Sequence, residues 1–168
     1  MSGPDQELFN LAMSDESRPL MYAVQKHIAE NVDPITEEFF ALNHGKADRW
    51  VWHPRQLELL DGAKAKAKET GLWNFFLPDA ETGEGLSNLD YAYIAAELGK
   101  SPLAPETLNC SAPDTGNMEV LERVGTPEQK DRWLTPLLNG EIRSAYAMTE
   151  PGVASSDAKN VATHAVLE

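Results

Sequence analysis

The stretch at residues 144–157 constrains the fold most, because its character differs from that of the chain before it. It reads Ser-Ala-Tyr-Ala-Met-Thr-Glu-Pro-Gly-Val-Ala-Ser-Ser-Asp. In its first half, small or apolar residues alternate with hydroxyl-bearing ones, which is typical of a β-strand. Its second half is a turn of proline, glycine and small hydroxyl residues. A strand that ends in such a turn leaves N–H groups and hydroxyls available to a phosphate or a flat heterocycle.

The chain before this stretch has a helical pattern. Apolar residues recur at helical spacing, and Ser, Thr, Pro and Gly mark where helices begin and end. The clearest start is a capping box in which Thr126 is the cap and Gln129 its partner. Ser17 is predicted to cap the first helix and Ser87 the helix at 87–98, and Pro34 is predicted to break or kink the first. Helices are expected at residues 17–33, 35–42, 54–69, 87–98, 117–124 and 127–138, with a connection at 101–106.

The order of these elements predicts a mainly α fold. We expect a leader at residues 1–16, an all-α domain at 17–142 and the start of a β domain at 143–168. The expected strands lie at 143–149 and 163–167. Because one pair of strands does not make a stable sheet, we expect that another chain completes it or that the polypeptide continues beyond residue 168.

The amino-acid composition limits which binding partners and which cellular location fit this chain. The 168 residues suit one domain, and 27 acidic against 14 basic residues give a net charge of −13. Such a charge argues against nucleic acid and anionic membranes as partners, and it suits either solubility or a basic partner. The single cysteine, Cys110, excludes an internal disulfide and fits a reducing, cytoplasmic location. Without a histidine near it in the sequence, Cys110 is expected to be a buried small apolar residue. The apolar runs are too short for a membrane span, and the N-terminus lacks the features of a signal peptide.

Three segments together point to one family. Residues 146–151, Tyr-Ala-Met-Thr-Glu-Pro, followed by Ser155, Ser156 and Asp157, resemble the flavin-contacting signature of acyl-CoA dehydrogenases. Residues 125–141 are similar to the helix that precedes that strand in the family. Residues 109–121, Asn-Cys-Ser-Ala-Pro-Asp-Thr-Gly-Asn-Met-Glu-Val-Leu, resemble a branch that in animals is fused to a phosphotransferase-like domain. That branch is linked to long-chain or hydroxylated acyl-CoA substrates.

The resemblance implies a helical N-terminal domain followed by the first strands of a truncated middle β-barrel domain that binds FAD. Met148 would contact the flavin ring through its backbone, and Thr149 through its hydroxyl and N–H. Ser155 would reach the FAD pyrophosphate and also the bound acyl-CoA, while Glu150 and Pro151 would hold the turn. The implied cofactor-binding residues are Tyr146, Met148, Thr149, Gly152, Ala154 and Ser155.

Two departures from the family pattern affect this assignment. The common version has glycine where this chain has Ala154, so the turn must accommodate a Cβ atom. The chain has Ser155 and Ser156 before Asp157, which leaves the hydroxyl that meets phosphate uncertain by one residue.

The family's catalytic base is a carboxylate far downstream, in a C-terminal helical domain. No residue of this chain matches it, so no catalytic residue is assigned.

The implied activity is oxidation of the Cα–Cβ bond of a fatty acyl-CoA, with hydride transfer to FAD. Residues 114–120 would form part of the wall against the acyl chain. An electron-transferring flavoprotein would accept the electrons, and the protein would form a homodimer or homotetramer. Two alternatives stay open: an acyl-CoA oxidase or flavin monooxygenase with the same architecture, and a non-catalytic helical module that binds a partner or acyl chain without flavin. The 168-residue chain alone is expected to be inactive.

Overall fold

The computed structural model describes residues 11–46, 48, 50–78 and 83–167, and it confirms the predicted mainly α fold. Most of the predicted leader, residues 1–10, lies outside this part. The elements in chain order are α2 (Arg18–His27), η1 (Ile28–Val32), α3 (Asp33–Ala41), α4 (Pro54–Glu69), α5 (Asn88–Leu98), α6 (Ala104–Thr107), α7 (Asp114–Val124), α8 (Pro127–Gln129), η2 (Lys130–Leu134), α9 (Thr135–Asn139) and η3 (Ala158–Asn160).

The first helix does not end at Pro34, so the prediction of two separate helices is wrong. The π-helical turn η1 joins α2 to α3, and the Asp33 N–H donates to the carbonyl of Ile28, five residues earlier. The same device recurs before Pro136, where η2 precedes α9 and the Thr135 N–H donates to Lys130. A proline inside an α-helix removes one N–H and clashes with the preceding turn. A wider π turn directly before the proline accommodates it.

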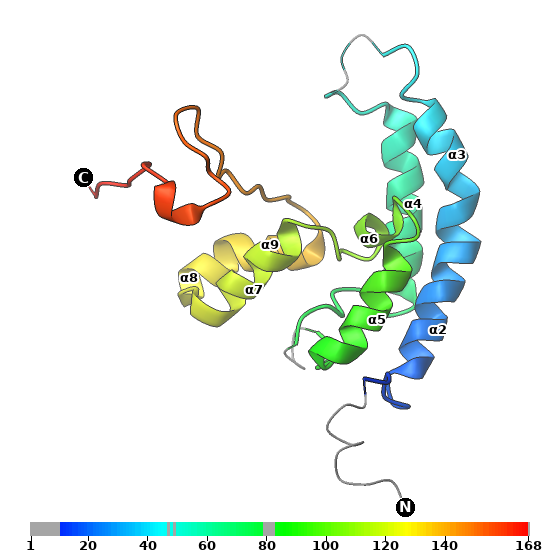
Figure 1. Cartoon of the computed structure of the whole chain (residues 1–168). Coiled ribbons are helices and arrows are strands. Elements are labelled where there is room, and N and C mark those ends of the chain that lie inside the picture. Colours follow the sequence, from blue (N-terminus) through cyan, green and yellow to red (C-terminus); the bar gives the residue numbers. More distant parts are fainter. Residues whose placement is uncertain (1–10, 47, 49, 79–82, 168) are drawn as a thin grey trace, which may run out of the picture.

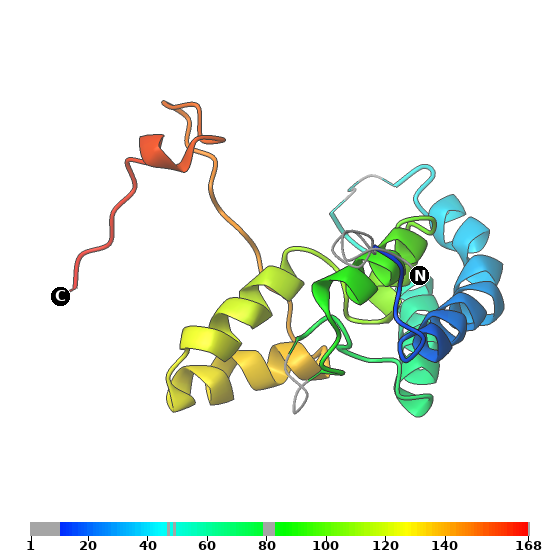
Figure 2. The same ribbon diagram turned by 60° about the horizontal axis from the view of Figure 1, so that its bottom comes forward.

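The helices form two groups, which Figure 1 and Figure 2 show from two sides. In the first group α4 packs against α3 and α6, and α2 packs against α5. In the second group α7 lies against η2 and α9. Residues 141–167 then leave the helices as an extended arm. A non-helical segment that includes Phe75 and Leu77, both almost fully buried, lies in the core between helices.

Two of the three predicted caps are confirmed. Thr126 Oγ1 accepts from the Gln129 N–H at 3.3 Å, and Gln129 Oε1 accepts from the Thr126 N–H at 2.9 Å. Ser87 caps α5 by accepting from the Asp90 N–H at 3.1 Å. The prediction for Ser17 is wrong, because its side chain makes no cap bond and its own N–H donates to Ser14 Oγ at 3.2 Å.

Other boundaries also differ from the prediction. The expected connection at 101–106 contains the start of the short helix α6, and α7 begins at Asp114 instead of residue 117. Within the described residues no strand is assigned, and residues 143–150 are extended without a partner strand. A β ladder requires a second strand, so the β domain expected at 143–168 stays a prediction. None of the described helices is long and apolar enough to cross a membrane.

Cys110 lies in the core beside the Phe75 region, as expected for a buried small residue. Its side chain is 8% exposed, and its Sγ donates to the Leu108 carbonyl at 3.4 Å. Burial raises the pKa of the Cys110 thiol to about 12. At neutral pH the thiol therefore stays protonated and unreactive.

His27 gives the helical domain a pH-dependent stability. Its ring is buried, with Nε2 at 3.2 Å from Thr107 Oγ1, and burial lowers its pKa below the ordinary 6.5. As the pH falls through 6.5, the His27 imidazole of the unfolded chain binds a proton, whereas the buried imidazole of the folded chain stays neutral to a lower pH. The free energy of unfolding should therefore fall as the pH drops from 7.5 to 5.5, by at most about 1.4 kcal/mol per pH unit.

Urea unfolding of the wild type and His27→Gln at both pH values measures this contribution. The variant should lose less stability than the wild type over the same interval, because glutamine does not titrate. An equal loss in both proteins would show that the pH dependence has another origin.

Candidate functional site: the arm at residues 146–155

The predicted cofactor residues lie on one short segment of the arm: Tyr146, Met148 and Thr149 precede a closed turn, and Gly152, Ala154 and Ser155 lie in it. The Glu150 N–H donates to Ser155 Oγ at 2.7 Å, and Ser155 Oγ donates to the Val153 carbonyl at 3.3 Å. The Glu150 carboxylate accepts from the N–H groups of Ala162 and Thr163, at 2.9 and 2.7 Å, and from the Thr163 hydroxyl. Thr163 and then Ala162 lower the pKa of Glu150 below its usual value. These bonds hold the turn against residues 162–163.

The predicted cofactor residues differ in exposure. Ser155 is 7% exposed, whereas Tyr146 is 71% exposed. Met148 is half-buried, and Thr149, Gly152 and Ala154 are exposed. The extended residues 146–149 therefore present backbone groups and the Thr149 side chain to an incoming group, while the Ser155 hydroxyl is already engaged within the turn.

Glycine is not required at residue 152 by the turn itself. A Cβ atom built there would meet no described atom within 4 Å, and the residue is not in the left-handed region. The exposed position of Ala154 also shows that the turn accommodates the alanine that departs from the family pattern. Any need for glycine at 152 would arise from close approach of a bound group.

The arm is joined to the helices by Arg143 and Ser144. Asp114, at the start of α7, is 2% exposed and accepts from the Ser144 N–H at 2.7 Å and the Ser144 hydroxyl at 2.6 Å. Its second carboxylate oxygen accepts from Arg143 Nε at 2.5 Å. Asn117 completes the contact by donating to Ser144 Oγ at 2.8 Å. These bonds fix the point where the chain leaves the helices.

The electrostatics of this junction keep it ionised. Burial raises the pKa of the Asp114 carboxyl, but the hydrogen bonds from Ser144 and Arg143 together lower it by more. The pKa therefore lies below its usual value. Burial lowers the pKa of the Arg143 guanidinium, but Glu106 and Asp114 raise it by more. The junction is therefore an ion pair at neutral pH.

A hollow of about 310 Å³ lies beside the junction, between α7, α9 and the start of the arm. It is mainly apolar and is lined by Asn117, Val120, Leu121, Trp133, Leu137, Ile142, Arg143, Ser144 and Ala145. Asn117 and Val120 belong to the segment 114–120 that the sequence places along an acyl chain. Asp114 does not line this hollow, because its side chain is turned to Ser144 and Arg143.

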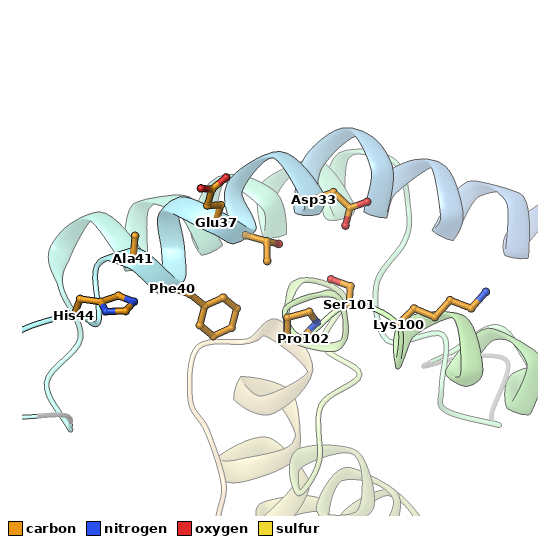
Figure 3. Close-up of a pocket in the computed structure, with 9 residues that line it drawn as sticks. Asp33, Glu37, Phe40, Ala41, His44, Lys100, Ser101 and Pro102 are labelled. Atoms are coloured by element: carbon orange, nitrogen blue, oxygen red, sulfur yellow. The ribbon is translucent and has the colours of Figure 1, made fainter.

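A wider hollow of about 640 Å³ lies elsewhere, between α3 and the residues that follow α5 (Figure 3). Asp33, Glu37 and Phe40 lie on its α3 side, and Ser101 and Pro102 face them. None of the predicted cofactor residues lines it. Ser101 Oγ is buried there without a hydrogen-bond partner in the described part of the chain.

The residues of the junction were missed by sequence reasoning. Asp114 and Ser144 are 30 residues apart, and periodicity within a helix carries no signal for such a pair. A lone arginine directly before a run that otherwise lacks charge, as at Arg143, is the signal that could have indicated an anchor. Among the described residues, no cluster of His, Cys, Asp or Glu is suited to hold a metal ion.

Comparison with known proteins identifies the class of this helical domain. The family described as "Acyl-CoA dehydrogenase, N-terminal domain" matches residues 14–141. The chain therefore belongs to the acyl-CoA dehydrogenase family, and the resemblance seen in the sequence is confirmed.

Particular relatives are found in animals and bacteria. The chain is 48% identical over 154 residues to "Acyl-CoA dehydrogenase family member 10" of Mus musculus, covering 89% of this chain and 14% of the relative. It is 58% identical over 106 residues to "Probable acyl-CoA dehydrogenase FadE2" of Mycobacterium tuberculosis, covering 62% and 25%. The solved "Structure of a putative acyl-CoA dehydrogenase from Mycobacterium abscessus" matches with a TM-score of 0.81 and 48% identity, covering 94% of this chain and 40% of that one.

Proposed function

We propose that this chain supplies the N-terminal helical domain and one wall of the FAD site of an acyl-CoA dehydrogenase that oxidises the Cα–Cβ bond of a fatty acyl-CoA. Family membership gives the oxidoreductase class. Because the chain spans only 14% and 25% of the two curated relatives named above, the activity of the whole protein is part of the proposal. The proposed domain boundary lies at residue 143, with the helical domain at 17–142 and the β domain beginning at 143–168.

The observation that carries this proposal is the arm that leaves the helical domain at Arg143. Residues 146–149 are extended and largely exposed, and the following turn is closed by the Glu150–Ser155 bond. An extended run of small, apolar and aromatic residues that ends in the Thr149 hydroxyl suits the face of a flat ring. The residues present therefore fit FAD, which when bound supplies the acceptor for hydride.

Each residue has a proposed role toward that group. The backbone of Met148 and the hydroxyl and N–H of Thr149 would bind the flavin ring, with Tyr146 beside them. Ser155 would exchange its bond to the Val153 carbonyl for a pyrophosphate oxygen of FAD, and it would also touch acyl-CoA. Gly152 and Ala154 would allow close approach at the turn. The proposed partners are acyl-CoA, an electron-transferring flavoprotein and further copies of the chain in a homodimer or homotetramer.

Thr149→Ala tests the proposal in the polypeptide extended to its stop codon. Loss of one hydrogen bond to the ring should weaken FAD binding or slow flavin reduction by acyl-CoA by about tenfold, since a bond of this kind contributes about 1.5 kcal/mol. Flavin absorbance and stopped-flow reduction measure the two effects. Thr135→Ala is the matched control, because Thr135 is exposed on α9 and does not line the hollow beside the arm.

The outcomes separate the hypotheses. Unchanged flavin content and reduction rate in Thr149→Ala would contradict the role of Thr149. If the wild-type polypeptide, extended to its stop codon, neither contains flavin nor takes up added FAD, the dehydrogenase hypothesis is contradicted. The alternative of a helical module that binds no flavin is then favoured. Rapid reoxidation of the reduced flavin by air would indicate an oxidase or a monooxygenase.

A further inference from the structure

The junction between helices and arm contains a chain of alternating charges drawn from three helices. Lys64 of α4 pairs with Glu106 of α6, with Nζ 2.6 Å from Oε1. The other oxygen of Glu106 pairs with the Arg143 guanidinium at 2.7 Å, and Arg143 pairs in turn with Asp114 of α7. Each carboxylate thus contacts at least one cation, and Arg143 bridges two carboxylates. The side chains of Lys64, Glu106 and Asp114 are 21%, 19% and 3% exposed, so solvent screens this chain only partly.

Asp114 is the member of this chain that contacts the arm's backbone. Its two oxygens bind consecutive residues, Arg143 through the side chain and Ser144 through both N–H and hydroxyl. An N–H that donates to a buried carboxylate fixes the orientation of its peptide plane. The recorded hydrogen bonds of the turn beyond this point are internal to the arm, between Glu150, Ser155 and residues 162–163. The direction of the arm is therefore set at the junction, where Asp114 is the residue that bonds both Arg143 and Ser144, with Glu106 and Asn117 each bonding one of them.

Arg143 also separates two hollows. It lines the hollow beside α7 and a second one of about 460 Å³ between α4, α6 and Gly140. A shift of the junction toward either hollow would move residues 146–149 with it, because the chain between them is short and extended.

We propose that Asp114 is a positioning residue for the flavin-contacting arm: it holds Arg143 and Ser144 so that residues 146–149 lie where the flavin ring is bound. This inference rests on the proposed FAD site. Asp114 itself touches neither FAD nor substrate, and it acts through the Ser144 peptide plane.

Asp114→Asn tests this role in the polypeptide extended to its stop codon, since it keeps the shape of the side chain and removes its charge. Hydrogen exchange at the Ser144 amide, whose N–H donates to Asp114, should be at least tenfold faster, and the dissociation constant of FAD at least tenfold higher. The visible band of any bound flavin should shift as well. All measurements are made at a temperature where circular dichroism shows the helices intact.

Three further variants make the result specific. Asp131→Asn makes the same chemical change at an exposed position of η2 and should alter neither exchange nor FAD affinity. Ile94→Val weakens the core without touching the junction, and it should lower the melting temperature but leave FAD affinity unchanged. Where Asp114→Asn does not fold, Ser144→Ala replaces it, because it removes only the hydroxyl and should give a smaller change in the same direction.

The outcomes distinguish the positioning role of Asp114 from the proposed FAD site itself. Unchanged exchange and unchanged FAD affinity in Asp114→Asn would overturn the positioning role. Faster exchange with unchanged affinity would also overturn it, while leaving the FAD site in place. If the wild type does not bind FAD at all, the proposed function fails independently of the exchange result.

Discussion

Phe75→Ala is expected to lower the free energy of unfolding of the helical domain by about 3–5 kcal/mol. Phe75 is 0% exposed and is among the largest fully buried side chains of the described core. Its ring meets Tyr91 edge to face at 6.4 Å between centroids, so alanine removes this contact and leaves a cavity. Urea unfolding followed by circular dichroism measures the loss.

Leu57→Ala is the control for Phe75→Ala. Leu57 lies on α4 and is 47% exposed, so its loss should cost far less. If the two variants were equally stable, the core would not be centred on the segment that contains Phe75.

Asn109→Ala is expected to cost about 2–4 kcal/mol, from two separate causes. Asn109 has φ of 56°, in the left-handed region that asparagine tolerates better than alanine. Its buried Nδ2 donates to Asn74 Oδ1 at 2.7 Å and to the Leu137 carbonyl at 3.0 Å. These bonds tie the core segment around Asn74 to α9, and alanine leaves the acceptors without this donor.

Asn109→Gly separates the two causes. Glycine adopts a positive φ without strain but supplies no amide, so this variant should lose less stability than Asn109→Ala. The same chemical denaturation experiment compares them. A glycine variant as unstable as the alanine variant would assign the whole cost to the lost hydrogen bonds.

Local signals in the sequence predicted much of the helical domain. The Thr126 box was found because cap and partner lie three residues apart, and α4 and α5 were found because their apolar spacing is regular. Features that depend on distant residues were missed. The missing cap bond at Ser17 could not be predicted, because the Ser14 hydroxyl that accepts from the Ser17 N–H belongs to a residue held by Asp90, 76 residues away. The π turns before Pro34 and Pro136 leave no mark in hydrophobic spacing.

The candidate site divides in the same way. Residues 146–155 of the arm could be named as a candidate from the sequence, because they are contiguous and form a distinctive motif. The junction that orients it could not, because Lys64, Glu106 and Asp114 come from three helices and meet only after the chain has folded. The expected strands remain a prediction because a strand is defined by its neighbour, and residues 143–150 have none among the described residues.

The burial of Cys110 makes the helical domain its own reporter. A thiol whose pKa is raised to about 12 and whose side chain is 8% exposed reacts with an alkylating reagent only after the surrounding helices separate. Because this sequence has a single cysteine, the rate at which Cys110 is alkylated at neutral pH measures how often the core opens. The measurement needs no engineered cysteine, and it gives the frequency of core opening in the native protein without denaturant.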